Sequence, residues 1–399
     1  MLNKFKFAAT AALLTFATQS FAQANEEAKA KIDDCREKFC SSLSLRSIEE
    51  LTSIPIEVLS LPSITTLRLS GTGITDISLV AQMPGLRSLD LSNTPIQDLS
   101  PLANLRALTH LDLGRTDIAD LSPLAGLSGL TNLNLRRTNV TDISELARHP
   151  GLTTLYLDRT GVTDLSPLAG LAGLETLDLE SVPATDFSAL SNLRVLTNLD
   201  LSKTAISDLS VIGSVILRSL TLSDTQVVDL SPLAAHGTLR DLKLHRTGVT
   251  DLVPLSDIAG LTNLYIDGTG ITDLFPIFAL DKLEQLSLDD TQVSDIFVVS
   301  VLPSLKGLQI RNTPVTDISA LSNAVRLTNL GIVGTQISDI SALAGATDLN
   351  WLEASGSQVS DLSALSGLEK LKNVYLRNTP AANSAQSAAL VARGVNVRE

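Results

Sequence analysis

Leucine and other apolar residues recur along this chain with one fixed spacing. From Ile64 onward, a unit of 22 residues repeats about fifteen times in the form L-x-x-L-x-L-x-x-T-x-[I/V]-x-D-[L/I]-S-P-L-A-x-L-x-x. Within one unit, the stretch from Ser88 to Ser92 alternates polar and apolar residues, which predicts a short strand. Ser100 and Pro101 then match a helix N-cap followed by proline at the first helical position, so we expect a short helix there.

A period in the twenties with leucine at three fixed places is typical of a leucine-rich repeat solenoid. We therefore predict an α/β solenoid, a right-handed horseshoe or arc with a parallel β-sheet on its concave side and short helices on its convex side. The expected organisation is a signal peptide at 1–22, an N-terminal cap at 23–63, a leucine-rich repeat domain at 64–379 and a C-terminal cap at 380–399.

Two polar columns repeat as regularly as the leucines. Threonine ends most strands, where its hydroxyl can bond the backbone of the turn that follows. Aspartate stands four places later in fourteen repeats, from Asp76 to Asp361. A ladder of cation sites would need further acids at ligand-like spacing, and no repeat supplies them. We interpret the column as structural, each carboxylate accepting N–H bonds from the turn that enters the convex helix.

The N-terminus predicts export, and the charge balance narrows the classes of partner. Lys4 and Lys6 precede a short apolar run, and Ser20-Phe21-Ala22 predicts cleavage before Gln23. No later segment is apolar for long enough to span a bilayer, so we expect an exported protein, periplasmic or secreted. The formal net charge of −13 argues against nucleic acid and anionic membranes as partners.

The two cysteines, Cys35 and Cys40, both precede the repeats. In an exported chain a disulfide is the favoured interpretation. Because residues five apart on one helix are too distant to bond, the helix predicted over Glu26 to Phe39 would have to end between them. Two free thiols are the alternative.

The 22-residue unit with L-x-L-x-x-T-x-[I/V]-x-D-[L/I]-S-P-L-A resembles the internalin-like class of bacterial leucine-rich repeat proteins. The resemblance covers residues 64–379 and implies an exported protein that binds a partner, often another protein, on its concave sheet. Threonine stands here where that class usually has asparagine. No immunoglobulin-like module or wall-sorting tail follows the repeats, so a free periplasmic or secreted binder fits better than a surface-anchored adhesin.

Residues that the scaffold leaves free carry the candidate binding chemistry. Every tyrosine and the single tryptophan of the chain fall at outward strand positions, and such residues are enriched at binding hot spots. Charged residues gather beside them, either as a ligand patch or as ion pairs between coils. The candidate ligand-binding residues are Arg115, Arg136, Arg137, Tyr156, Asp158, Arg159, Asp178, Glu180, Lys243, His245, Tyr265, Trp351 and Tyr375.

The convex side has an anomaly of its own. The serine of the S-P-L-A segment becomes Val253, Phe275 and Phe297 in three successive repeats, and Phe278 replaces a small residue nearby. This apolar strip is either an interface or filler at a bend.

The histidines of this sequence do not form a pattern typical of a catalytic or metal site. His149 and His236 occupy convex leucine columns, and His110 and His245 lie six coils apart, which is about 29 Å at strand spacing. We predict no catalytic residues, no metal and no cofactor. We expect a protein partner of unknown identity and a monomer in which weak self-association is possible. The alternative is a glycan-binding module, for which Asn132, Asn198, Asn263, Asn329 and Asn373 supply an amide column.

Overall fold

The structure is a computed structural model that describes residues 22–399. Its contacts divide the chain into two compact units, residues up to Leu196 and Thr197–Glu399, and each is described by itself. The predicted signal peptide at 1–22 lies outside the described residues except for Ala22. Of the helices within residues 22–399, none is both long and apolar enough to cross a membrane.

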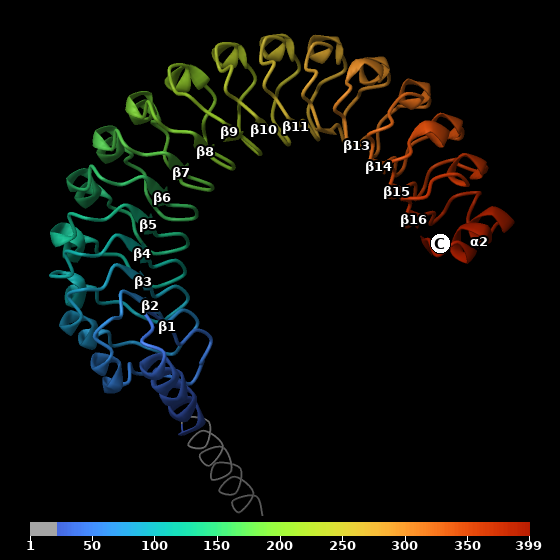
Figure 1. Cartoon of the computed structure of the whole chain (residues 1–399). Coiled ribbons are helices and arrows are strands. Elements are labelled where there is room, and N and C mark those ends of the chain that lie inside the picture. The colour runs from blue at the N-terminus through green and yellow to red at the C-terminus, as the bar shows by residue number, and fades with distance from the viewer. Residues whose placement is uncertain (1–21) are drawn as a thin grey trace, which may run out of the picture. The chain divides into compact units, whose positions relative to one another are not determined.

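The first unit opens with a helix over residues 22–37 and continues as coils of one strand and one short 3₁₀ helix (Figure 1). Its strands are β1 (Ser42–Ser44), β2 (Thr66–Arg68), β3 (Ser88–Asp90), β4 (His110–Asp112), β5 (Asn132–Asn134), β6 (Thr154–Tyr156) and β7 (Thr176–Asp178). Its 3₁₀ helices are η1 (Ile56–Ser60), η2 (Ser78–Gln82), η3 (Ser100–Leu102), η4 (Ser122–Gly126), η5 (Ser144–Arg148), η6 (Ser166–Gly170) and η7 (Ser188–Asn192).

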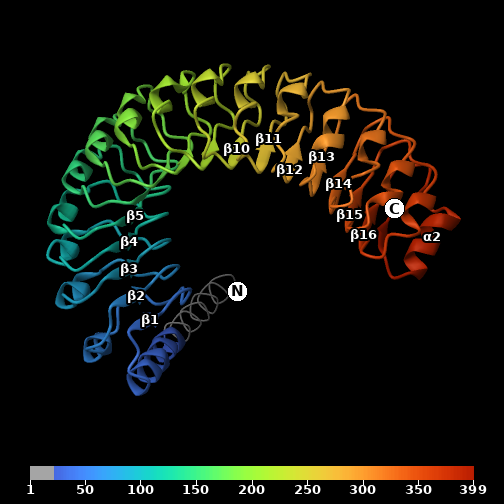
Figure 2. The same ribbon diagram turned by 45° about the horizontal axis from the view of Figure 1, so that its top comes forward.

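The second unit repeats the same coil and ends in a helix and a last strand (Figure 2). Its strands are β8 (Asn198–Asp200), β9 (Ser219–Thr221), β10 (Asp241–Lys243), β11 (Asn263–Tyr265), β12 (Gln285–Ser287), β13 (Gly307–Gln309), β14 (Asn329–Gly331), β15 (Trp351–Glu353), β16 (Asn373–Tyr375) and β17 (Asn396–Arg398). Its helices are η8 (Leu209–Ile212), η9 (Ser231–Leu233), η10 (Val253–Leu255), η11 (Phe275–Ile277), η12 (Phe297–Val301), η13 (Ser319–Leu321), η14 (Ser341–Gly345), η15 (Ser363–Leu365) and α2 (Ala385–Ala392).

The strands of each unit pair in parallel and in chain order, as predicted. Leu67 lies opposite Leu89, and Leu89 lies opposite Leu111, so that one leucine column follows the sheet. The same register relates Leu242, Leu264 and Leu286 in the second unit. These leucines are almost fully buried, and their neighbours in the strands lie on the exposed face of the sheet. We call that surface, predicted to be concave, the sheet face, and the side that carries the 3₁₀ helices the helical face.

The turn that leaves each strand has the same construction throughout. The residue before the threonine column has a left-handed backbone, with φ of 53° at Asn93 and 70° at Gly71. The threonine that follows is buried and donates its hydroxyl to a carbonyl three residues earlier, as Thr94 does to Leu91 at 2.5 Å. Thirteen threonines make this bond, which confirms that the column closes the turn.

The aspartate column closes the second turn of each coil. Asp98 accepts a hydrogen bond from the backbone N–H of Ser100 at 2.8 Å, and all fourteen aspartates make the equivalent bond at 2.7 to 2.9 Å. These hydrogen bonds stabilise the charged carboxylate: the backbone N–H and the hydroxyl of Ser122 lower the pKa of Asp120. The structural interpretation of this column is therefore confirmed.

One expectation about the helical face needs correction. The short helices are 3₁₀ turns of three to five residues, and the serine is their first residue instead of a side-chain cap. The capping oxygen comes from the aspartate two residues before it. A 3₁₀ turn suits this place because it advances farther per residue than an α-helix, so a short segment can cross the coil.

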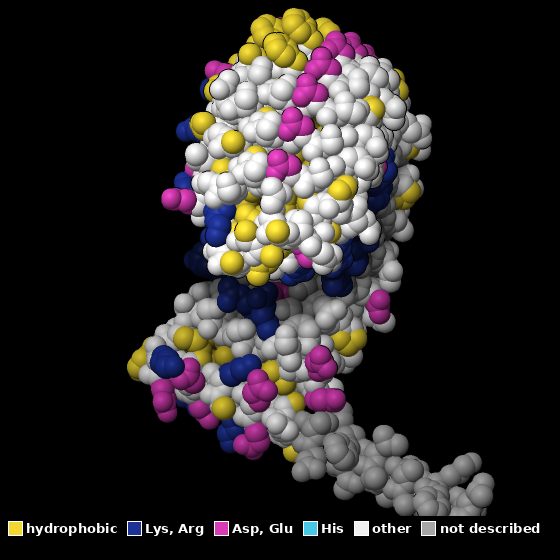
Figure 3. Space-filling model, turned by 90° about the vertical axis from the view of Figure 1, so that its right-hand side faces the viewer, with side chains coloured by type: hydrophobic (Ala, Val, Ile, Leu, Met, Phe, Trp, Pro, Cys, Tyr) yellow, Lys and Arg dark blue, Asp and Glu magenta, His cyan; other side chains and the backbone are white. Residues whose placement is uncertain are grey.

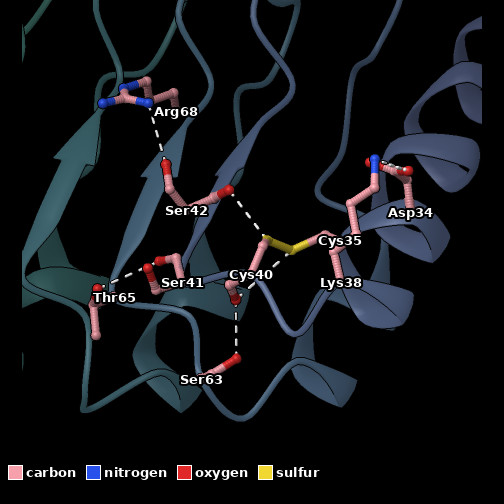
Figure 4. The surroundings of a disulfide bond; sticks show 9 residues. All are labelled: Asp34, Cys35, Lys38, Cys40, Ser41, Ser42, Ser63, Thr65 and Arg68. Carbon is pink, nitrogen blue, oxygen red and sulfur yellow. Dashed lines mark hydrogen bonds and ion pairs between the residues drawn. A yellow bond between two sulfur atoms is a disulfide. The ribbon is translucent and has the colours of Figure 1, made fainter.

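Both ends of the chain carry elements that extend the sheet. The first helix ends at residue 37, between Cys35 and Cys40, and a disulfide joins the two cysteines with their Cα atoms 5.0 Å apart (Figure 4). Ser63 donates a hydrogen bond to the Cys40 carbonyl at 2.9 Å, which ties this bridge to the first coils. At the other end Ser384 caps α2 and Gly394 ends it with φ 87°, before β17 pairs with β16.

The aspartate column gives a first prediction. Replacing Asp164 by alanine leaves the Ser166 N–H without its acceptor, so unfolding should become easier by about 1 kcal/mol, as for a lost helix cap. Asp164→Asn keeps an oxygen at the same place and should lose less. Calcium or a chelator should change neither variant in a thermal or urea unfolding experiment. A melting temperature that rises strongly with calcium would show that the column binds cations.

Candidate functional site

The sheet face holds all four candidate aromatic residues, each half-buried between neighbouring coils. Tyr156, Tyr265 and Tyr375 are the last residues of β6, β11 and β16, so they occupy one register position. Trp351 is the first residue of β15 and lies two positions earlier in its coil. Because strand neighbours point to opposite sides, both positions face outward with the leucine between them buried.

In the first unit, Arg136 is the centre of the predicted charged group. Its guanidinium lies 5.4 Å from the ring centroid of Tyr156, and its Nε lies 3.0 Å from Oδ1 of Asp158. A second nitrogen is 3.5 Å from Oδ2 of Asp178. Asp158 is only 5% exposed, so this contact is a partly buried ion pair with an aromatic ring beside it.

Three other arginines of this group hold a strained backbone. Arg115, Arg137 and Arg159 have φ of 59°, 52° and 57°, in a column where other coils carry glycine or asparagine and some carry aspartate, serine or lysine. This conformation costs side-chain-bearing residues free energy, and outliers of this kind gather at functional sites. Arg159 pairs with Glu180 at 3.2 Å. Arg115 and Arg137 are exposed, and within residues 22–399 their guanidinium groups have no hydrogen-bond or ion-pair partner.

A polar hollow lies beside these arginines. It encloses about 380 Å³ and is lined in part by Asp112, Gly114, Arg115, Asn134 and Arg136. A Cβ at position 114 would come within 2.9 Å of Cγ of Arg136, so glycine there leaves Arg136 its place. An adjoining hollow of about 340 Å³ extends to Tyr156. Burial raises the pKa of Asp112 and outweighs its hydrogen bond from the Gly114 N–H.

The second unit carries a comparable group around Tyr265. Nζ of Lys243 lies 5.9 Å from the Tyr265 ring centroid, and the ring of His245 lies 5.7 Å from it. Nδ1 of His245 is 2.6 Å from Oδ2 of Asp267. Arg246 again has a left-handed backbone, with φ 54°, and makes two hydrogen bonds to Asp224 at 2.6 and 2.7 Å.

Two neighbouring carboxylates continue this group. Asp267 accepts hydrogen bonds from the Ser287 hydroxyl and from the backbone N–H of Asp289, the latter at 2.9 Å. Burial acts to raise the pKa of Asp267, but hydrogen bonds from His245 and Ser287 outweigh it and the pKa is lowered. Burial raises the pKa of Asp289 to about 6, although its carboxylate accepts the Arg311 N–H.

Trp351 and Tyr375 form a third aromatic place near the end of the second unit. Their ring centroids are 5.9 Å apart. The guanidinium of Arg311 lies 5.8 Å from the Trp351 ring, and that of Arg398 lies 5.4 Å from the Tyr375 ring. Each of the four aromatic residues on the sheet face thus has a cation over it.

Sequence reasoning missed part of this arrangement. It did not identify Arg311 or Arg398 as partners of aromatic rings, nor the pair formed by Asp267 and Asp289. Counting 22 residues along the chain places Arg311 and Asp289 in one outward column, so the signal was present.

Catalytic and metal-binding groups are sparse in the part of the chain that the structure describes. His149 and His236 are 1% and 3% exposed, and burial lowers the pKa of His149. No group of three or more histidine, cysteine, aspartate or glutamate side chains within residues 22–399 could hold a metal ion. What the sheet face offers chemically is contact area, hydrogen bonds and charge.

Comparisons with known proteins agree with this description. Residues 62–104 and 106–148 match the family model described as Leucine Rich repeats (2 copies). No curated protein sequence is a significant match. Among solved structures, the internalin InlF of Listeria monocytogenes is 29% identical, with a TM-score of 0.52 over 85% of this chain and 88% of that chain.

Two further structures share the fold at lower identity. The functional domain of InlJ from Listeria monocytogenes is 23% identical, with a TM-score of 0.63 over 82% of this chain and 70% of that one. A leucine-rich repeat protein of Leptospira interrogans is 19% identical, with a TM-score of 0.80 over 92% and 98% of the two chains. With the repeats described above, these likenesses show a leucine-rich repeat solenoid that is similar to the bacterial internalins.

Proposed function

We propose that this protein is an exported, non-enzymatic binding protein that holds a protein partner on its sheet face. The proposed organisation is a signal peptide at 1–22, caps at 23–63 and 380–399, and the repeats at 64–379 between them. One observation carries the proposal: every aromatic side chain of the sheet face lies under a cation. Aromatic and arginine side chains supply most of the binding energy in protein interfaces.

The first unit offers the best-developed part of this surface. Tyr156 and Arg136 provide a partly buried anchor, and Arg115 and Arg137 provide charges that no neighbour neutralises. Free guanidinium groups can form paired hydrogen bonds with carboxylates of a partner. A protein with this fold is known in a peptide complex: the plant peptide hormone receptor RGFR1 was solved in complex with RGF2, and it shares the fold with this chain at a TM-score of 0.55 and 15% identity.

A glycan is the second candidate ligand for the same face. The two hollows beside Arg136 and Tyr156 favour a glycan, because Asp112, Asn132 and Asn134 line them with groups that can hydrogen-bond sugar hydroxyls. The two ligands separate in one experiment: the purified protein is probed in parallel with extracytoplasmic proteins and with a glycan array. Retention on the array alone would replace the protein partner by a glycan.

Truncation of the anchor should weaken binding without disturbing the fold. Tyr156→Ala or Arg136→Ala should each cost about 1 to 4 kcal/mol of binding free energy, as hot-spot residues do. Calorimetry with the captured partner measures this. Arg106→Ala, at an exposed site in the loop after η3, is the control and should bind normally. Undiminished binding by a variant lacking Tyr156, Tyr265, Arg136 and Lys243 would place the ligand elsewhere.

The strained arginines allow stability and binding to be separated. Arg137→Gly relieves the left-handed backbone, so the free energy of unfolding should stay equal or rise by up to about 1 kcal/mol. Arg137→Ala keeps the strain and should give no such gain. Both variants lose the guanidinium and should bind more weakly than the wild type. If both bind as tightly as the wild type, Arg137 is a residue of the scaffold alone.

The half-buried carboxylates Asp267 and Asp289 give the stability of the protein a pH dependence. Because the pKa of Asp289 is raised to about 6, the folded state binds a proton that the unfolded state has already lost, and stability contributed by this group falls as pH rises from about 4 through 6. Asp289→Asn should therefore raise the unfolding free energy at pH 7, by up to about 2 kcal/mol, and the gain should vanish below pH 4.

Asp267→Asn is the matched control for this measurement. The pKa of Asp267 is lowered, so its variant should lose stability at pH 7 and the loss should shrink as pH falls. Urea unfolding between pH 3.5 and 8 distinguishes the two. Equal and pH-independent effects in both variants would contradict the assignment.

A further inference from the structure

The helical face of the second unit carries an exposed apolar patch that the sheet face does not explain. It consists of Val253, Phe275, Phe278, Phe297 and Val301, and we call it the phenylalanine strip. Phe275 and Phe297 are 70% and 72% exposed, so they are not filler inside a bend. In Figure 3 hydrophobic side chains gather at the top of the molecule, and a row of acidic side chains borders them.

The phenylalanine strip surrounds a shallow hollow of about 230 Å³. Phe275 and Phe278 stack with their ring centroids 5.2 Å apart and form one part of its lining. Phe297 and Val301, from the next coil, form another. A hollow of this size admits one large apolar side chain, which is the form that an anchor residue takes in a protein interface.

The carboxylates beside the phenylalanine strip differ from those of several other coils. In five coils the serine hydroxyl donates a hydrogen bond to the second oxygen of the capping aspartate, as Ser122 does to Asp120 at 2.9 Å. Asp251, Asp273 and Asp295 cap their coils through Oδ1, but valine or phenylalanine offers no hydroxyl. Among the described residues the second oxygen of these three carboxylates has no hydrogen-bond partner. Asp273 and Asp295 line the apolar hollow, and Asp251 caps the preceding coil of the strip, so each of the three can accept a cation.

We propose that the phenylalanine strip docks a basic amphipathic segment of a partner protein, distinct from the ligand of the sheet face. One apolar side chain of the segment enters the hollow between Phe275 and Phe297, and its lysines or arginines lie over Asp251, Asp273 and Asp295. Charge favours this occupant over a second copy of the chain. The net charge of −13 and the acidic row repel another copy, whereas they attract a basic segment.

A pair of synthetic peptides tests this docking. The probe is a fluorescent amphipathic peptide with leucine and phenylalanine on one face and lysine on the other, and its twin carries glutamate in place of lysine. Binding to the full-length mature protein is followed by fluorescence anisotropy. The Phe275→Ser, Phe297→Ser double variant should bind the lysine peptide about tenfold more weakly or worse, because the anchor is lost.

The chain supplies matched controls for these variants. Serine is the residue that other coils carry at these two places, so the double variant should fold, and circular dichroism and thermal unfolding verify this. Val228→Ser removes another exposed apolar side chain of the same unit, outside the strip, and should leave binding unchanged. Asp273→Asn with Asp295→Asn keeps the capping oxygens and removes the charges, so binding should weaken and lose most of its salt dependence.

Three results would overturn the proposal. The first is equal binding of the lysine and glutamate peptides, and the second is unchanged binding by the double phenylalanine variant. The third is self-association of the wild-type protein in sedimentation experiments that the double variant abolishes, which would make a second copy the occupant. Tyr156→Ala should bind the lysine peptide normally, so failure here and failure of the proposed sheet-face function are recognised separately.

Discussion

The fold depends on closing the same turn in every coil without leaving a buried polar group unpaired. A strand that meets its neighbours in register must be followed by a chain reversal at the same place each time. A left-handed residue makes that reversal, and the buried threonine after it returns a hydroxyl to the carbonyl of its own coil. The bond is local, so each coil is complete before it stacks, and stacking then adds the leucine columns and the parallel strand bonds. Val182 shows the limit of the rule. It lacks the hydroxyl, yet its amide still bonds Leu179 and the residue before it keeps φ 60°.

This construction separates the positions that must be kept from those that can vary. Leucine, threonine and aspartate hold each coil, while the outward strand residues vary from coil to coil. Some of them, such as Asp112 and Asn134, also accept a hydrogen bond from a backbone N–H of the turn. The left-handed column belongs to both classes, because it closes the turn and also presents its side chain. Glycine or asparagine would serve the turn best, and the chain carries these in several coils. Arginine at positions 115, 137 and 159 has this less favourable backbone, as do Ser181, Lys203 and Asp224 in later coils.

The regular part of this structure could be predicted because the same 22-residue unit is repeated along the sequence. The strands, their register, the threonine and aspartate bonds, and the end of the first helix between Cys35 and Cys40 all follow from periodicity and elementary chemistry. The 3₁₀ geometry of the helical face did not follow, because three to five residues carry no helical period. Two of the four cations over aromatic rings, Arg311 and Arg398, were also missed. Arg311 follows β13 and Trp351 begins β15, two coils later, so the repeat count does not place them in one column. In the structure the Arg311 guanidinium nevertheless lies 5.8 Å from the Trp351 ring.

The serine column shows how one substitution acts on two interactions at once. In five coils with serine, the hydroxyl donates a hydrogen bond to the second oxygen of the capping aspartate, and the side chain at the surface is polar. With phenylalanine, the cap to the backbone remains, so the coil stays closed, but the aspartate gains an unused oxygen while an aromatic ring enters solvent. Apolar area and available negative charge therefore appear together, coil by coil, without any change to the core. Because the sheet face and the helical face share only the fixed columns between them, either surface can change while the other keeps its structure.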